Sequence, residues 1–273
     1  MTRKKTDELP SIDPALRKVD RARKHIDDLE QGVAAYVEDS TTWRYDDDSE
    51  ERGRVIVKVE QMVAPPVELA LICGDVVHNL RTALDYVIFQ LGIADKGMVS
   101  DESQFPLLLT TPSARDWKSI VNGILGLLSP VHVEEVRRLQ PFSDARDNTI
   151  NVKLGMLSAL DNRDKHRLPL VVDTAASRGT VSLDKPVRRV QITHQVGDVI
   201  PIKDDTELFR LKAWGGPINV AIHARIQFGI SFGHERGPTV LNLRDLANTA
   251  AGVIGAFGID IGAAARKSPE GSR

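Results

Sequence analysis

The chain has 273 residues, 41% hydrophobic and 27% charged, with a formal net charge of −2 at pH 7. This is the composition of a globular protein with a sizeable core, and it excludes a histone-like or polybasic protein, so that a nucleic-acid or anionic-lipid partner needs a local patch of cations. The single cysteine, Cys73, excludes an intrachain disulfide framework and a CxxC zinc site. Without a signal-peptide pattern in the first residues, we expect a cytoplasmic protein.

The first predicted element is a long amphipathic helix from Asp13 to about Glu38. Asp13 and Pro14 are typical of a helix cap and a first helical position. Residues 1–12 are expected to be disordered. Valines at alternating positions 55, 57 and 59, together with Trp43 and Tyr45, predict a β-hairpin whose acidic tip, residues 46–51, is solvated.

Four further helices are predicted in the middle of the chain. The longest spans residues 67–91, where apolar residues recur every three or four positions. Two shorter helices follow Ser113 and Ser129-Pro130, and another spans residues 148–166. Together with the first helix, they indicate a helical bundle.

The apolar period changes to two between Leu168 and Ser231, which predicts short antiparallel strands. The strand candidates are residues 170–172, 180–183, 187–194, 207–214 and 219–231. A last helix covers residues 239–257, and its most apolar stretch, 250–259, has about half of the roughly 20 residues of a membrane span. We therefore expect one α+β domain over residues 13–260, a helical bundle packed with an antiparallel β-sheet, followed by a flexible tail at 261–273. No membrane association is expected.

A polar strip on the helix at 67–91 is the most unusual feature of the sequence. With 100° per residue, Asp75, Asn79, Thr82 and Tyr86 lie within about 40° of one another, flanked by His78, Arg81 and Asp85. A solvated helix face is one interpretation. However, solvated faces are usually rich in Lys, Glu and Gln, whereas these residue types are those of buried networks and active sites. We therefore expect a partly covered strip.

The second unusual segment is residues 160–167, at the end of the helix at 148–166. The apolar face of that helix continues into Asp161 and Asp164, which need a partner if they are buried. One interpretation is a helix end where the aspartates point to water and the following cations meet the helix dipole. The alternative brings this segment against the polar strip, in a cluster of Asp75, His78, Asn79, Arg81, Asn162, Asp164, Lys165 and His166.

These two segments carry the motifs GDxxHNLRxALD, at residues 74–85, and NxDKHR, at residues 162–167. The pair resembles that of a family of uncharacterised bacterial proteins. More loosely, the bundle with its polar strip resembles the HEPN domains, many of which are dimeric, metal-independent ribonucleases of toxin and phage-defence systems. Their signature is an Arg followed by a His four to six residues later on a helix. Arg81 matches the Arg, but Tyr86 stands where the His is expected, so that His78 or His166 has to replace it.

The resemblance implies an RNA-acting protein, a metal-independent ribonuclease of a toxin or phage-defence system, with RNA as partner and a homodimer or other homo-oligomer as assembly. A neutral His78 or His166 removes the 2′-hydroxyl proton, while Arg81 and Lys165 stabilise the charge on the phosphate. We expect no cofactor and no metal. The residues that orient this site are Asp75, Asn79, Asp85, Asn162 and Asp164.

Two other classes of protein stay open at this point. A metal-dependent hydrolase could use Asp75 and His78, at positions i and i+3 of one helix, together with Asp161, Asp164 or His166. Alternatively, the chain is a non-catalytic oligomeric binding protein in which the polar network specifies the bundle core. The polar face of the strand at 219–231, with His223, Arg225 and Gln227, then binds the partner.

Overall fold

The computed structural model describes residues 3–47, 54–142, 149–166, 172–183, 189–195, 200–201, 204–214, 222–232 and 239–267. The chain forms two compact units. The helical unit comprises Met1–Asp27, Ile72–Leu168 and Leu241–Arg273, and the strand unit comprises Asp28–Leu71 and Pro169–Val240. The described chain is mostly helical and also carries antiparallel strands, in agreement with the expected α+β class.

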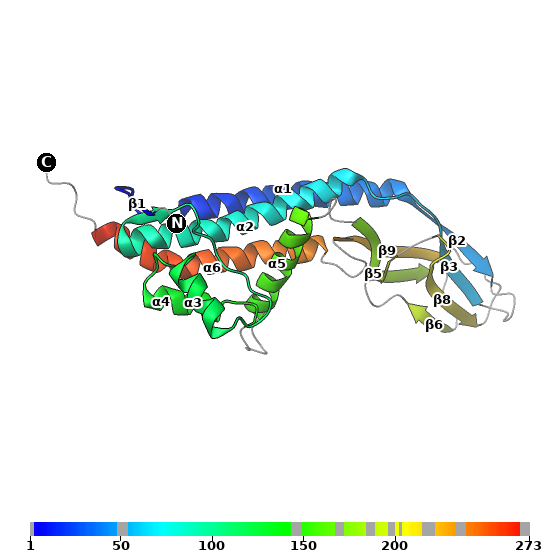
Figure 1. Cartoon of the computed structure of the whole chain (residues 1–273). Helices are drawn as coiled ribbons and strands as arrows, with labels where there is room; N and C mark the ends of the chain where they lie inside the picture. Colours follow the sequence, from blue (N-terminus) through cyan, green and yellow to red (C-terminus); the bar gives the residue numbers. More distant parts are fainter. Residues whose placement is uncertain are drawn as a thin grey trace. The chain divides into compact units, whose positions relative to one another are not determined.

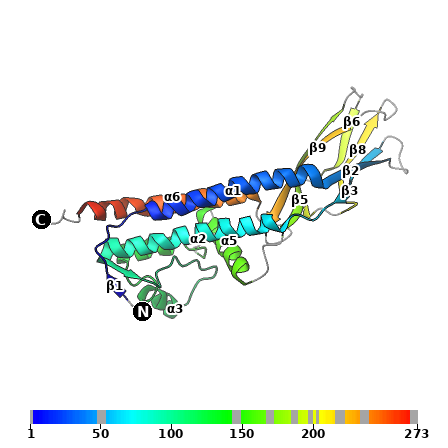
Figure 2. The ribbon, with the colours of Figure 1, turned by 90° about the horizontal axis from the view of Figure 1, so that it is seen from above.

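All the predicted helices are present. They are α1 (Asp13–Ser40), α2 (Val67–Lys96), α3 (Ala114–Asn122), α4 (Pro130–Arg138), α5 (Thr149–His166) and α6 (Val240–Lys267). In the helical unit, α1 lies side by side with α2 and α6 (Figures 1 and 2). The Arg244 guanidinium of α6 is 2.9 Å from Asp27 of α1, and the Lys18 ammonium of α1 donates to Asn79 of α2. Arg23 of α1 also donates to Asn248 of α6, and the two pairs Asp27–Arg244 and Arg23–Asn248 show that α6 runs antiparallel to α1.

The core of the helical unit follows the predicted apolar faces. On α2, the five residues expected on the buried side are at most 1% exposed: Val76, Leu80, Leu84, Val87 and Leu91. The five expected on α6 are at most 3% exposed: Leu243, Leu246, Ala250, Val253 and Phe257. On α5, Leu154, Leu157 and Leu160 are buried as expected, whereas Ile150 is 38% exposed because it lies in the first turn of the helix.

The beginning of the chain differs from the expected disorder. Residues 3–5 form β1 (Arg3–Lys5), which pairs antiparallel with β4 (Met98–Ser100). Ser11 donates its N–H to the Gln90 side chain, and Arg3 donates to the Asn122 carbonyl. Backbone pairing of this kind needs no apolar pattern, which is why the sequence does not reveal it.

The end of the chain differs from the expectation as well. Helix α6 continues to Lys267, so that residues 261–267 of the expected flexible tail are helical, and Ile261 is buried. Residues 240–266 are long and apolar enough to cross a membrane, judged by length and composition alone. The apolar part of this helix is therefore longer than the stretch at 250–259 that the sequence pattern indicates. Its buried side belongs to the core of the helical unit.

The strand unit contains two antiparallel sheets, in the orders β2-β3-β8-β6 and β7-β5-β9. Strands β2 and β3 form the predicted hairpin, whose tip at residues 48–53 lies outside the described residues. The strand candidate at 180–183 and residue 172 of the candidate at 170–172 belong to a single strand, β5, which pairs with β9 along its length; residues 170 and 171 lie outside the described residues. The strands are β2 (Thr41–Asp47), β3 (Arg54–Met62), β5 (Val172–Leu183), β6 (Arg189–Gln195), β7 (Ile200–Pro201), β8 (Glu207–Trp214) and β9 (Ile222–Phe232).

Candidate functional site

The two motif segments meet where α5 ends against α2. The Asp164 carboxylate lies so close to Gly74 that a Cβ built on Gly74 would be 2.7 Å from Asp164 Oδ1. Any side chain at residue 74 would therefore displace this carboxylate. The glycine of the GDxxHNLRxALD motif thus permits the close approach of α5 to α2, in agreement with the expectation that the two segments touch.

Arg81 makes the second contact between the two segments. Its Nη1 lies 2.9 Å from Asp85 Oδ1 on the same helix, and its Nε lies 3.8 Å from Asp161 Oδ2 on α5. The Arg81 side chain is 12% exposed and that of Asp161 is 8% exposed. The ion pairs of Arg81 use Asp85 and Asp161, whereas Asp164 lies about one turn further along α5, at Gly74.

Arg81 and Asp85 also hold the backbone of Phe105 from both sides. The Arg81 Nη2 donates to the Phe105 carbonyl oxygen at 2.6 Å, and the Phe105 N–H donates to Asp85 Oδ1 at 2.8 Å. The Phe105 side chain is fully buried. This ion pair therefore fixes the segment after β4 to α2, a role that the sequence pattern alone could not reveal.

The remaining polar residues of α2 form an exposed edge beside this network. His78 and Asp75 are exposed, and Tyr86 is 37% exposed. Asn79 is buried and donates its side-chain N–H to the Asp75 carbonyl, while the Thr82 hydroxyl donates to the His78 carbonyl. The expected partly covered strip is therefore divided: Asn79 and Arg81 are covered, Thr82 and Asp85 are half-buried, and Asp75, His78 and Tyr86 are exposed.

The candidate residues at the end of α5 are placed by their backbone. Asn162 is exposed, and Lys165 and His166 are the last residues of the helix, immediately after Asp164. The side chains of Lys165 and His166 lie outside the part of the chain that the structure describes. His78 follows Gly74 by four residues on α2, so it lies about one helical turn, roughly 6 Å, from the point where Asp164 meets α2.

Cys73 lies next to Gly74 and is fully buried. Burial raises the pKa of the Cys73 thiol far above its ordinary value, and the neighbouring Asp164 carboxylate raises it further. A thiol that stays protonated is a poor nucleophile. Cys73 is therefore a core residue, as the apolar face of α2 predicts.

Metal ligation by the described side chains has no support from their geometry. Among these residues, no group of three or more His, Cys, Asp or Glu side chains could hold a metal ion. The side chains of Asp75 and His78, the pair considered for a metal-dependent hydrolase, are among the described ones; the side chain of His166, the other imidazole of that hypothesis, is not.

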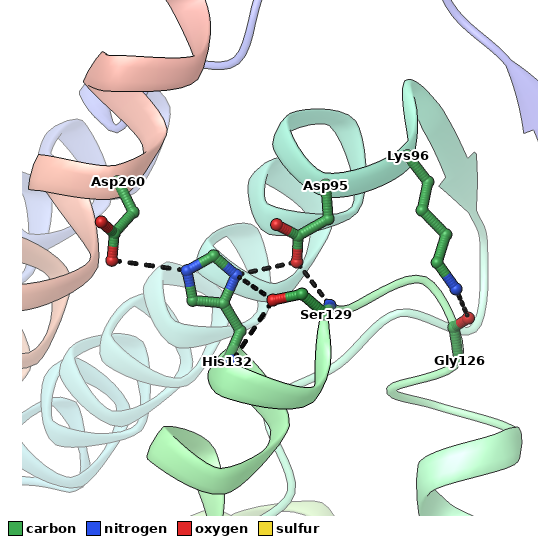
Figure 3. A network of polar contacts seen from close by, with 6 residues as sticks. All are labelled: Asp95, Lys96, Gly126, Ser129, His132 and Asp260. Atoms are coloured by element: carbon green, nitrogen blue, oxygen red, sulfur yellow. Dashed lines mark hydrogen bonds and ion pairs between the residues drawn. The ribbon is translucent and has the colours of Figure 1, made fainter.

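A second polar cluster, which the sequence pattern does not predict, joins α2, α4 and α6 around His132 (Figure 3). The ring Nδ1 of His132 is 2.8 Å from Asp95 Oδ2, and its Nε2 is 3.4 Å from Asp260 Oδ2. Ser129, the N-cap of α4, donates its backbone N–H to the same Asp95 oxygen at 2.6 Å. The signal in the sequence was the cap itself, because Ser129-Pro130 places residue 132 where its N–H meets the Ser129 hydroxyl.

The two carboxylates lie on opposite sides of the His132 ring, as Figure 3 shows, and therefore cannot share one metal ion through it. The Ser129 hydroxyl and the Asp95 carboxylate both contact Nδ1 of the His132 ring. In a catalytic triad, the aspartate contacts one ring nitrogen and the nucleophilic serine contacts the other. This cluster consequently holds helices together and is not a catalytic triad.

Comparisons of the chain with protein-family models, with curated proteins and with solved structures find no match.

Proposed function

We propose that the chain is a HEPN-like, RNA-acting protein that cleaves RNA without a metal ion, of the type that serves toxin or phage-defence systems. The observation that supports this proposal most is the place of His78. Its side chain is exposed, and it lies about one helical turn from the junction of the two motif segments at Gly74 and Asp164. An accessible imidazole beside a fixed junction is what proton transfer to a bound substrate requires.

In the proposed reaction, neutral His78 takes the proton of an RNA 2′-hydroxyl. The 2′-oxygen forms a bond to the adjacent phosphorus, and the bond from phosphorus to the 5′-oxygen breaks. The leaving 5′-oxygen takes a proton from the His166 imidazolium, so that the products are a 2′,3′-cyclic phosphate and a 5′-hydroxyl. Lys165 stabilises the charge that develops on the phosphate oxygens.

Arg81 was expected to stabilise the charge on the phosphate, and its contacts favour a positioning role instead. Its guanidinium is committed to Asp85, Asp161 and the Phe105 carbonyl, and only 12% of its side chain is exposed. We therefore assign Arg81 to positioning α2 against α5, and Asp75, Asn79, Asp85, Asn162 and Asp164 to orienting the site around it.

The test is cleavage of a mixed-sequence, end-labelled RNA by the purified full chain in the presence of EDTA. We expect cleavage by the wild-type chain and a loss of about 10²-fold or more in His78→Ala and His166→Ala, the usual contribution of a positioned proton-transfer group. His194→Ala, in β6 of the strand unit, is the matched control and should cleave at the wild-type rate.

Each other outcome contradicts the proposal in a recognisable way. If EDTA abolishes cleavage and a divalent metal restores it, the metal-dependent hydrolase replaces the ribonuclease. If the folded chain cleaves no RNA under any of these conditions, the non-catalytic binding protein replaces it. If His78→Ala and His166→Ala cleave as well as His194→Ala, the site lies elsewhere.

We further propose that the helical and strand units form one α+β domain in which the bundle packs with the antiparallel sheet. Helices α1 and α2 each contribute residues to both units, so the chain passes between the units within helices. One cooperative unfolding transition, followed by near- and far-ultraviolet circular dichroism, is expected. Two separate transitions would contradict a single domain.

A further inference from the structure

The first half of α1 carries a concentration of positive charge that the ribonuclease mechanism does not use. Residues 17–25 contain five Lys or Arg residues and one Asp, in a chain whose net charge is −2. With 100° per residue, five cationic or titratable side chains fall within an arc of about 120° on the helix. We call this set the α1 stripe; its members are Arg17, Lys18, Arg21, Lys24 and His25.

Arg17, Arg21 and Lys24 of the α1 stripe are exposed, and the edge of the stripe at Lys18 reaches α2. Lys18 donates to Asn79 of α2, whereas Arg23, on the other side of the helix, pairs with Asp20 and donates to Asn248 of α6. Arg21 donates to His25 within the stripe. Within the part of the chain that the structure describes, Arg17 and Lys24 form no ion pair.

The contact between Lys18 and the covered Asn79 brings one member of the α1 stripe to α2, beside the exposed edge that carries Asp75, His78 and Tyr86. Asn79 directly follows His78, and Tyr86 lies on the same exposed edge two turns further along the helix. The cations of the α1 stripe, spaced about one turn apart, thus lie on the helix next to the edge of α2 that carries the exposed imidazole of His78 and the exposed ring of Tyr86. Both features belong to the helical unit.

We infer that the α1 stripe binds the phosphodiester backbone of single-stranded RNA and delivers the strand to His78. The inference rests on the proposed function, because only RNA carries the 2′-hydroxyl on which His78 acts. Lys and Arg side chains along one face of a helix are the usual means of neutralising a nucleic-acid backbone. The exposed ring of Tyr86 is a surface on which an unpaired base can stack, whereas the bases of a paired duplex are stacked on one another and cannot reach it.

The test measures binding separately from cleavage. The probe is a fluorescein-labelled 2′-O-methyl oligouridylate, which has no free 2′-hydroxyl and cannot be cleaved. Its Kd for the full chain is measured by anisotropy across a series of salt concentrations, for the wild type, for Arg21→Ala/Lys24→Ala, and for the matched control Arg115→Ala/Lys118→Ala. The control removes the same charge from exposed positions on α3.

We expect the α1 double variant to raise the Kd about tenfold or more, and the α3 control to change it by less than about twofold. The slope of log Kd against log salt concentration should fall by about 1.4 in the α1 variant, because each phosphate contact to a single strand contributes about 0.7. Unchanged helical circular dichroism and melting temperature establish that both variants are folded.

Three results would overturn the inference: equal Kd values for the two double variants, preference for a paired RNA duplex over the single strand, or binding of the wild type only to equimolar phosphatidylglycerol and phosphatidylcholine vesicles.

A cleavage assay on ordinary RNA separates this failure from that of the proposed function. If the α1 stripe is wrong and the ribonuclease right, Arg21→Ala/Lys24→Ala cleaves with the wild-type KM. If the α1 stripe is right and the ribonuclease wrong, that variant loses binding although no chain cleaves.

Discussion

The Asp164 carboxylate lies against Gly74, at the position where any other residue would place its side chain. These two residues are 90 positions apart in sequence, and each belongs to one of the two polar motifs. Gly74 lies in the interior of α2, where glycine costs about 1 kcal/mol relative to alanine. The close approach of α5 explains why the helix carries a glycine at this position.

This relationship predicts an unusual response to Gly74→Ala. In an open helix position, the change to alanine should stabilise the chain by up to about 1 kcal/mol. At Gly74 the gain should be cancelled, because Asp164 Oδ1 is 2.7 Å from the new methyl group and has to move. The measurement is the free energy of unfolding in urea. Gly255→Ala on α6, where nothing lies within 4 Å of the added Cβ, is the control that should show the full gain.

The double variant Gly74→Ala/Asp164→Ala identifies the cause. Because the colliding carboxylate is absent in this variant, the alanine at residue 74 should recover its stabilising effect relative to Asp164→Ala alone. A Gly74→Ala variant as stable as Gly255→Ala would be inconsistent with the contact between α2 and α5.

Arg81→Ala should be among the most destabilising single changes in the helical unit. It removes the ion pair with Asp161, whose side chain is 8% exposed, and the donor to the Phe105 carbonyl. Breaking a buried ion pair from one side costs about 3–5 kcal/mol. The control, Arg138→Ala, removes ion pairs of a side chain that is 69% exposed and should cost less than about 1 kcal/mol.

If the cost at Arg81 comes from the broken ion pair with the buried Asp161 carboxylate, Arg81→Met/Asp161→Leu should be clearly more stable than Arg81→Ala. Apolar replacements of a buried ion pair are often neutral. A double variant no more stable than the single one would assign the cost to the lost contact with Phe105.

The cluster around His132 predicts unequal contributions from its two carboxylates. His132→Ala should cost about 1–3 kcal/mol, since Asp95, 12% exposed, loses a hydrogen bond and the ring contact with Phe257 is lost. Asp260→Asn should cost less than about 0.5 kcal/mol, because Asp260 is 59% exposed and 3.4 Å from the ring. Urea unfolding checks both values, and equal costs would contradict the geometry in Figure 3.

Cys73 predicts a loss of stability at alkaline pH. Burial and, to a smaller degree, Asp164 raise the pKa of the thiol in the folded chain, while in the unfolded chain it ionises near its ordinary value, about 8.5. The unfolded state therefore binds fewer protons above that pH, and the free energy of unfolding falls with a limiting slope of about 1.4 kcal/mol per pH unit. Below pH 8 the thiol contributes no pH dependence.

The check on Cys73 is the difference in unfolding free energy between the wild type and Cys73→Ala at several pH values. Other alkaline titrations are common to both chains and cancel. A difference that stays constant between pH 8 and pH 10 would mean that the thiol ionises equally well in the folded chain.

The sequence by itself determined the helices and most of the strands. Capping residues such as Ser113 and Ser129, and apolar residues spaced three or four positions apart, act within a single helix, so a local pattern is sufficient. Both caps and the buried side of α2 agree with that pattern. The sequence also predicted that the two polar motifs meet, because polar residue types of this kind are rare on solvated faces.

Only the tertiary structure decided what each polar side chain does. Arg81 and His78 lie three residues apart on α2, yet Arg81 is covered by Asp161 and Phe105 while His78 is exposed. Strand β1 pairs with β4 across more than 90 residues. The partner of a charged or backbone group depends on which distant segment packs against it, and helical periodicity gives a direction for each side chain but not the identity of what lies there.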